Sequence, residues 1–370
     1  SAASDVYKRQ VDGDDEKPDM AIGRFPVVEP EEVRAIVSKS IAYAQNPEVG
    51  PWRRQVLYIA NESSAYQLRS DQSALRMVER GWVTHKIYPA SDKSVSEEHT
   101  RGIVDLLDQG LQIVHFIGHG GRYIWRTGPR DLELNRDLFT LDHLDDLSPT
   151  RRLPVVLSLT CYSAPFDHPT ADSIGEKFIR LDGRGAIAVV AASWRNSPSP
   201  QMGEALMSEL SQPGATIGGA VQRAKNAINN PVLIQTYNLL GDPAAPVAAP
   251  GHSIRLKTSR RDGGWRVQGR SKIKRFSGGL AIVEWLDADL QVVHREELLL
   301  ARPKFAVELP DAAVVEGAEA ASVRAYMWNP DTCQDAVGWI GFESLELNDA
   351  GSRTSQSAQA DRGQKVRGSS

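Results

Sequence analysis

Short, nearly continuous apolar runs alternate with amphipathic stretches through roughly the first two thirds of the chain. Apolar residues at helical spacing, as at Val33, Ile36 and Val37, predict helices, whereas the continuous runs predict buried strands. The expected strands are 20–28, 55–60, 82–88, 111–117, 154–160 and 185–192. The expected helices are 30–45, 71–80, 94–110, 171–181, 201–211 and 216–229, with a loop to about 133 and a helix or turns through 147. This alternation predicts an α/β fold with a mostly parallel sheet and helices on both faces.

The pattern changes after about residue 250, where apolar residues begin to alternate with polar ones. Ile254 and Leu256 form one such pair, and Phe305, Val307 and Leu309 form another run of the same kind. Short alternating runs about ten residues apart, with Gly and Pro between them, predict a β-sandwich. We therefore expect a second domain of strands over residues 251–348.

The remaining segments complete the expected organisation. Residues 11–50 precede the main α/β region, 51–250, and residues 349–370 form a polar tail that we expect to be disordered. Residues 1–10 resemble a translated sequencing adapter, so we leave them out of the fold prediction and expect the natural start to lie upstream.

Composition narrows the classes of function. The formal net charge of −4 gives no reason to expect a nucleic acid or an anionic membrane as the main partner. No apolar stretch reaches the roughly 18 residues that a membrane span needs. The two cysteines, Cys161 and Cys333, do not make a disulfide framework.

Two of the expected strands end at side chains that carry chemistry. The run 111–117 ends just before His119, and the run 154–160 ends just before Cys161. Because parallel strands end at the same edge of a sheet, this places an imidazole beside a thiol. A cysteine attacks as the thiolate, and a nearby histidine can lower its pKa and then protonate a leaving amine. The backbone amides of Gly120 and Cys161 are the candidate donors for the oxyanion.

Each of these residues also has a simpler interpretation. A lone cysteine at a strand end is commonly a small buried hydrophobe, and Cys333 is expected to be structural or incidental. His115 and His119 share a strand face and could suggest a metal pair, but no third ligand follows at suitable spacing, so we expect no metal. His168, seven residues after Cys161, is a competing base.

Other polar and aromatic positions admit two readings as well. Trp125 and Trp194 are candidate walls of a substrate cleft, or aromatics packed on loops. Asp242 before a proline fits a turn, and Glu176 fits a cap or a pair within its helix. The glycines around His119 lack the following Lys-Ser/Thr of a phosphate-binding loop, so we do not expect a nucleotide site.

Several local motifs occur in a fixed order. They are Gly23-Arg-Phe-Pro26, Gly118-His-Gly-Gly121 with Trp125, Leu159-Thr-Cys-Tyr-Ser-Ala-Pro-Phe-Asp167, Ser173-Ile-Gly-Glu176, Gly185-Ala-Ile-Ala188 and Tyr237-Asn-Leu-Leu-Gly-Asp-Pro243. Together they resemble the gingipain-type cysteine peptidases, peptidase family C25, over roughly residues 15–250. The resemblance implies a caspase-like α/β fold, a Cys/His dyad and an immunoglobulin-like domain after it. It also implies that residues 11–50 are the end of a first catalytic subdomain, most of which lies upstream.

The resemblance also assigns further roles. It implies that Glu62 is an acid assisting His119 and that Asp71 is the acid of a pocket for a basic P1 side chain. Trp194, as a candidate cleft wall, is expected to bind substrate as well. The resemblance implies no required cofactor, although structural calcium is compatible with the family, and a secreted or cell-surface bacterial location. The expected partners are protein or peptide substrates.

Three functions remain open on the sequence. The first is a cysteine endopeptidase acting through a thioester acyl-enzyme. The second is an adhesion or interaction module that keeps the peptidase fold without turnover. The third is a caspase-like signalling protease. The sequence around Cys161 argues against this function, because it lacks the Gln-Ala-Cys-x-Gly signature of caspases.

Overall fold

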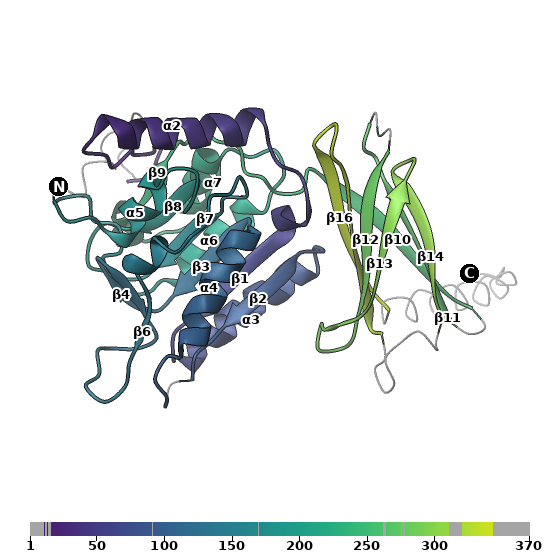
Figure 1. Cartoon of the computed structure of the whole chain (residues 1–370), viewed down its shortest axis with the longest axis horizontal. Helices are drawn as coiled ribbons and strands as arrows, with labels where there is room; N and C mark the ends of the chain where they lie inside the picture. The colour runs from purple at the N-terminus through teal and green to yellow at the C-terminus, as the bar shows by residue number, and fades with distance from the viewer. Residues whose placement is uncertain are drawn as a thin grey trace, which may run out of the picture.

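The computed structural model describes residues 11, 13, 16–90, 92–168, 170–261, 264–274, 276, 278–310 and 320–342. The predictions for residues 1–10 and 349–370 fall outside the described residues. Figure 1 shows an α/β part, in purple to teal, followed by a β-sandwich, in green to yellow. No helix in the described part is long and apolar enough to cross a membrane.

A six-stranded sheet forms the centre of the α/β part. Its order is β2-β1-β3-β7-β8-β9, and all neighbouring pairs are parallel except β8 and β9. The strands are β1 (Gln55–Ala60), β2 (Val83–Ile87), β3 (Ile113–Ile117), β7 (Val155–Leu159), β8 (Ala188–Ala192) and β9 (Tyr237–Gly241). The prediction of a mostly parallel sheet is confirmed, and the antiparallel edge strand β9 is the addition that the apolar pattern did not predict.

Helices cover both faces of this sheet, and each face has its own buried apolar cluster. One layer contains α2 (Pro30–Gln45), α4 (Glu97–Gln109) and α5 (Ile174–Arg180). The other contains α3 (Ser64–Val78), α6 (Pro200–Leu210), α7 (Ile217–Asn226) and α8 (Pro231–Thr236). Short 3₁₀ turns, η1 (Pro51–Arg54) and η2 (Asp142–Leu144), connect elements. The helix predicted at 71–80 begins seven residues earlier, so that boundary was wrong.

The segment before the main sheet packs on it. The strand expected over 20–28 is reduced to one isolated bridge between Arg24 and Leu240. On α2, the ammonium of Lys39 is buried and donates to the carbonyl oxygens of Ile179 (2.8 Å) and Ala186 (3.2 Å). Burial lowers the pKa of Lys39 to about 7.

A small three-stranded sheet replaces the loop expected after β3 and the first part of the helix or turns expected through 147. It consists of β4 (His119–Gly121), β5 (Ile124–Arg126) and β6 (Asp137–Thr140) in that order. These strands are too short to give a periodic signal, so the pattern alone indicated a loop. Trp125 at the centre of β5 is fully buried and stacks on Phe116, with ring centroids 4.7 Å apart.

The β-sandwich follows a short connection after β9. Its strands are β10 (His252–Arg261), β11 (Gly264–Ser271), β12 (Gly279–Leu286), β13 (Val292–Leu300), β14 (Lys304–Pro310), β15 (Ser322–Asn329) and β16 (Gln334–Gly341). They pair in the order β13-β12-β15-β16-β10-β11-β14. The first, second and fifth strands adjoin, as do the third, sixth and seventh, which is the arrangement of immunoglobulin-like sandwiches.

The two parts meet through buried charges. Glu284 of β12 lies 3.1 Å from Arg54 Nη2 and 2.6 Å from Arg324 Nε, and all three side chains are almost fully buried. Burial alone would raise the pKa of Glu284, but the two arginines outweigh it and hold the pKa below its ordinary value. The backbones of the two parts also approach each other closely. A Cβ on Gly81, which has φ +85°, would lie 2.6 Å from Val337 Cγ2 of the sandwich.

Candidate active site

The site begins where β3 and β7 end. These strands are neighbours, and their register pairs Ile117 with Leu159. His119 and Cys161 each follow two residues later, so both lie at the carboxyl edge of the sheet. A Cβ on Gly120 would lie 2.7 Å from the side chain of Thr160, which shows that the two strand ends pass close to each other. The side chain of His119 is exposed, and that of Cys161 is partly exposed.

The turn after Cys161 has an unusual backbone. Tyr162 adopts φ +52°, a left-handed conformation that residues other than glycine rarely adopt. Its amide donates to the carbonyl of Trp194 (3.3 Å), and the Ala164 amide donates to Ala192 (3.0 Å). These bonds hold the loop over residues 161–173, which we call the Cys161 loop, against the end of β8.

An exposed aromatic pair lies beside Cys161 as a result. The rings of Tyr162 and Trp194 meet edge to face, with centroids 6.1 Å apart, and Trp194 is 55% exposed. Trp194 therefore presents apolar ring surface to solvent beside the loop that carries Cys161.

Arg122 joins the β4–β5 turn to the Cys161 loop. Its guanidinium is 11% exposed and donates to Ala171 O (2.9 Å), to Tyr162 Oη (3.1 Å) and to the carboxylate of Asp167. Its backbone carbonyl accepts from the amide of Ile174 (2.6 Å). The hydrogen bond from Arg122 lowers the pKa of Asp167, which keeps that carboxylate ionised. The segment carrying His119 and the loop carrying Cys161 are therefore connected through one side chain.

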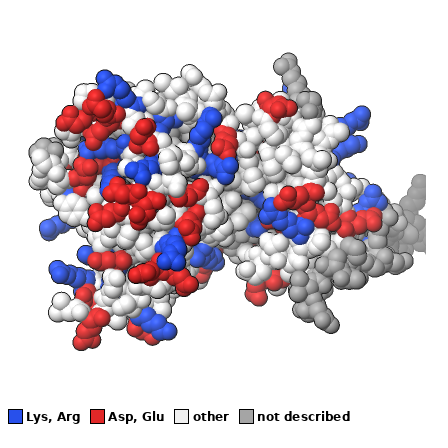
Figure 2. All heavy atoms as spheres, in the orientation of Figure 1, with Lys and Arg blue, Asp and Glu red and all other residues white. Residues whose placement is uncertain are grey.

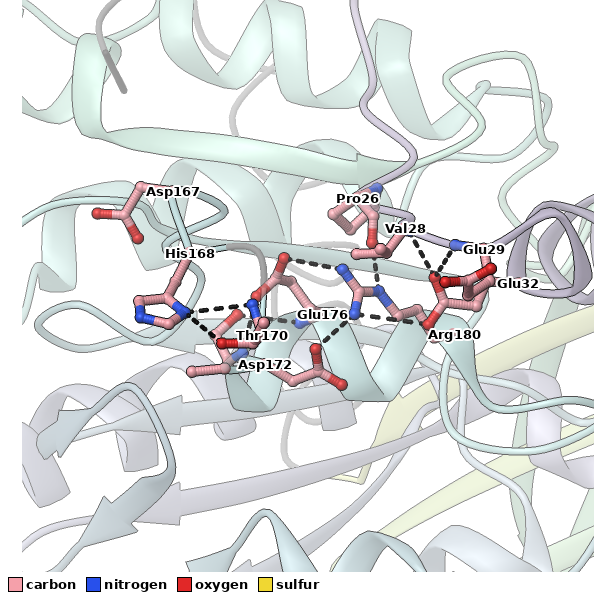
Figure 3. A network of polar contacts seen from close by, with 12 residues as sticks. Pro26, Val28, Glu29, Glu32, Asp167, His168, Thr170, Asp172, Glu176 and Arg180 are labelled. Carbon is pink, nitrogen blue, oxygen red and sulfur yellow. Dashed lines mark hydrogen bonds and ion pairs between the residues drawn. The ribbon is translucent and has the colours of Figure 1, made fainter.

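The far end of the Cys161 loop is anchored on α5. Figure 3 shows Arg180 reaching Asp172, Glu176 and the carbonyl of Pro26, with His168 and Thr170 farther along the loop. Ser173 and Glu176 form a capping box at the start of α5, so the expected cap and pair for Glu176 are confirmed. Burial raises the pKa of Glu176.

Tyr237 is a neighbour of Cys161 that the apolar pattern did not single out. It lies at the start of β9, opposite Ala192, and is fully buried. Burial and the nearby Cys161 raise the pKa of its phenol, and its hydroxyl has no hydrogen-bond partner in the described part of the chain. The only signal in the sequence was its place in the Tyr237–Pro243 motif.

Glu62 and Asp71 have ion-pair partners of their own. Glu62 follows β1, its amide donates to Thr127 O (2.8 Å), and its carboxylate pairs with Arg136. Thr127 directly follows Arg126, which is the register partner of His119. The carboxylate of Asp71 lies within α3, 2.7 Å from Lys86 Nζ. Asp71 was expected near the start of its helix; the earlier start of α3 places it in the middle instead.

Several of the competing interpretations can now be compared with the structure. Trp125 is buried, so its proposed role as a cleft wall was wrong. Its indole N–H donates to Ser158 Oγ (2.8 Å), which in turn donates to Ser163 Oγ in the Cys161 loop (2.9 Å). His168 lies in the same loop, and its Nδ1 accepts from the Thr170 amide (3.2 Å).

The remaining histidine and cysteine lie elsewhere. His115 is buried in β3, where burial lowers its pKa to about 4, and its ring centroid lies 5.2 Å from that of Tyr58. Cys333 lies at the contact between the two parts, with Sγ 3.4 Å from Pro47 O. Within the described ranges no three His, Cys, Asp or Glu side chains gather in a way that could hold a metal ion. Figure 2 shows acidic and basic side chains interspersed over the α/β part on the side in view.

Comparisons with known proteins relate this site to a family. Gingipain R2 of Porphyromonas gingivalis is 23% identical over 267 residues, which cover 65% of this chain and 34% of that protein. Gingipain R1 of the same species is 23% identical over a stretch that covers 65% of this chain and 25% of that protein. The chain thus spans about a third or less of the length of these curated relatives.

The fold agrees with a solved structure. The crystal structure of the Arg-specific cysteine proteinase gingipain R superposes with a TM-score of 0.55 at 15% identity, and the match covers 91% of this chain and 78% of that one. It therefore extends over the α/β part and into the β-sandwich. The model of peptidase family C25 matches residues 1–248, two thirds of the chain, including both strand ends of the site. The chain belongs to peptidase family C25.

Proposed function

We propose that the protein is a cysteine endopeptidase in which Cys161 is the nucleophile and His119 the general base and acid. The observation that carries this proposal is the register of β3 and β7, which brings the two strand ends to one edge of the sheet. In the proposed reaction the thiolate of Cys161 attacks the peptide carbonyl and forms a tetrahedral intermediate. His119 protonates the amine as it leaves, and water then hydrolyses the thioester.

The backbone around both residues supports the next step. We propose that the amides of Gly120 and Cys161 donate to the oxyanion. Any side chain at Gly120 would collide with Thr160 and with the carbonyl of Ile124, so the close packing of the two strand ends requires glycine at this position. Glu62 is proposed to assist through the hairpin that carries His119. The carboxylate of Glu62 also pairs with Arg136, so the charges of both residues would act on His119.

A basic P1 residue is the proposed specificity. One similar structure is described as Arg-specific, and Asp71 was assigned to the pocket by resemblance. The ion pair between Asp71 and Lys86 is a competing role for that carboxylate. Trp194, exposed beside the Cys161 loop, is the proposed apolar wall for the substrate. The same proposal includes protein or peptide substrates and a secreted or cell-surface location. It also includes no required cofactor and a structural role for calcium, if calcium binds.

The experiment is a peptidase assay with fluorogenic peptides ending in Arg, Lys or a neutral residue. Cys161→Ala should lower kcat/KM at least about a thousandfold, because the nucleophile is lost. Cys333→Ala should leave it unchanged. Asp71→Asn should reduce the preference for Arg over the neutral residue. Equal turnover by wild type and Cys161→Ala would refute the proposal.

An inactive adhesion or interaction module is the second candidate. The partial exposure of Cys161 supports the peptidase, since a catalytic thiol must be able to ionise and react. An iodoacetamide probe at mildly acidic pH should label Cys161 in the peptidase, and His119→Ala should slow that labelling. Absence of labelling, together with absence of turnover, would favour the inactive module.

A further inference from the structure

A groove lies between the two parts of the molecule, at the end of the central sheet opposite to Cys161. It has a volume of about 660 Å³ and is bordered by the end of α3, the start of β2, the connection before β10, and β11 and β16. β2 begins at this end, whereas His119 and Cys161 follow the carboxyl ends of their strands. A five-residue strand spans roughly 17 Å, so the groove is well separated from the proposed active site.

Cations dominate the charged residues that line the groove. Arg80, Arg255, Arg270 and Lys272 line it, with Glu79 as the one acid among the lining residues. The rest of the lining is largely apolar, aromatic or small, and includes Trp82 and Trp339 together with Pro213 and Pro250.

Three cations form a row across the outward face of the sandwich at this point. Arg255 of β10 is the register partner of Arg270 of β11, and Arg270 is the register partner of Lys304 of β14. All three side chains are exposed. We call these residues the cationic row. Among the residues that the structure describes, no member of the row forms an ion pair with an acid.

Another row on the same face is charge-balanced. Arg266 of β11 lies opposite Glu308 of β14, with Nη1 4.0 Å from Oε1. Like charges directly across a sheet destabilise it, whereas opposite charges stabilise it. The cationic row therefore carries a cost in stability that the Arg266–Glu308 pair avoids, and two of its members, Arg255 and Arg270, line the groove.

We propose that this groove binds an acidic, extended polypeptide segment of another protein. Charge complementarity is the reason, because carboxylates would neutralise Arg255 and Arg270 and relieve their mutual repulsion. The volume falls within the range of roughly 300–1,000 Å³ that is usual for ligand pockets, which fits a segment of a few residues.

The lining favours a peptide over a long polyanion. Trp339, which is partly exposed, and Pro213, which is exposed, offer apolar contact to side chains that lie between the carboxylates of a peptide. The whole chain also has a net charge of −4, and acids are interspersed among the bases on the side of the molecule shown in Figure 2. A long polyanion would meet those acids, whereas a short segment would not.

Fluorescence anisotropy with the full chain tests the proposal. The probe is a fluorescein-labelled peptide of alternating Glu and Tyr, which contains no basic residue. Arg270→Glu should weaken binding about tenfold or more, since it replaces an attraction by a repulsion at the centre of the row. The matched control is Arg101→Glu, which changes an exposed arginine on α4 that forms no ion pair with the described residues and should leave the affinity within about twofold of wild type.

Thermal unfolding provides a second measurement that does not depend on the probe. Arg270→Glu creates opposite charges with both neighbours in the row, so its melting temperature should rise by about 1–3 °C. Unsaturable binding by wild type, or equal affinity of wild type and Arg270→Glu, would overturn the proposal. So would binding of heparin but not of the Glu/Tyr peptide, which would assign the groove to a sulfated polysaccharide. None of these outcomes depends on peptidase activity.

Discussion

The carboxyl edge of the sheet and the contact between the two domains hold their polar residues in opposite ways. At the edge, His119 is exposed, Cys161 is partly exposed, and Arg122 connects their two segments. At the domain contact, Glu284 is almost fully buried and lies between Arg54 and Arg324. The first arrangement leaves an imidazole and a thiol open to solvent. The second leaves no room for solvent, so each charge must have a partner.

Because of this difference, we expect substitutions at the edge to affect activity and substitutions at the domain contact to affect stability. An exposed imidazole contributes little to folding, so its removal should be felt in the reaction alone. A buried carboxylate between two arginines contributes nothing to the reaction, but its removal leaves cations buried without a counter-charge.

The largest effect is expected at the exposed edge. His119→Ala should lower kcat by about a thousandfold, because proton transfer to the leaving amine is lost. The melting temperature should stay within about 1 °C of wild type, since the side chain is exposed. Steady-state kinetics and thermal unfolding of the same preparation measure both. A large loss of stability would show that the side chain of His119 also contributes to folding.

The next effect is expected at the domain contact. Glu284→Gln should reduce the free energy of unfolding by about 3–5 kcal/mol, because Arg54 and Arg324 would be left without a buried anion. Chemical denaturation measures this, and Glu308→Gln, on the exposed face of the same domain, is the matched control.

The pH dependence of the same contact has a definite sign. The pKa of Glu284 is lower in the folded protein than its ordinary value of 4.5. Its contribution to stability is therefore present above pH 4.5 and is lost as the pH falls through the lower folded pKa. Glu284→Gln should lose this part of the acid dependence, and an unchanged acid transition would argue against the role assigned to the ion pairs.

The smallest effect is expected at the connection between the two catalytic segments. Arg122→Lys keeps the charge but loses the planar fork, so kcat should fall about tenfold while KM changes little. Asp167→Asn should do the same, and the double variant should be no worse than either single one, because both break one connection. A rise in KM without a change in kcat would show that Arg122 contacts substrate and does not position Cys161.

Much of the fold followed from local patterns. The five parallel strands and most of their covering helices were predicted because continuous apolar runs and helical spacing are strong signals, whereas the short helix α8 was not predicted. The small sheet β4–β6 and the edge strand β9 were not predicted, because strands of three to five residues repeat too little to show a period. The start of α3 was misplaced because its buried apolar residues, Ala74, Met77 and Val78, all lie in the second half of the helix.

The strands of the sandwich show another limit of pattern analysis. Glu284 of β12 is a charged residue that is almost fully buried, which alternation of apolar and polar residues does not predict. Both faces of β12 are buried there, one in the sandwich core and one against the α/β part. A charged residue can be buried at such a place when arginines from two other elements meet it, and those elements are far apart in the sequence.

The sequence by itself determined the two strand ends, the order of the motifs around His119 and Cys161, and the division into an α/β part and a sandwich. These features depend on residues close together in the chain, and the spacing of apolar residues and the direction of the strands are enough to predict them. Only the tertiary structure decided that Trp125 is buried, that Arg122 reaches Tyr162 and Asp167, and that the cationic row borders a groove. Such contacts depend on strand register and on the packing of one domain against the other, which no local pattern specifies.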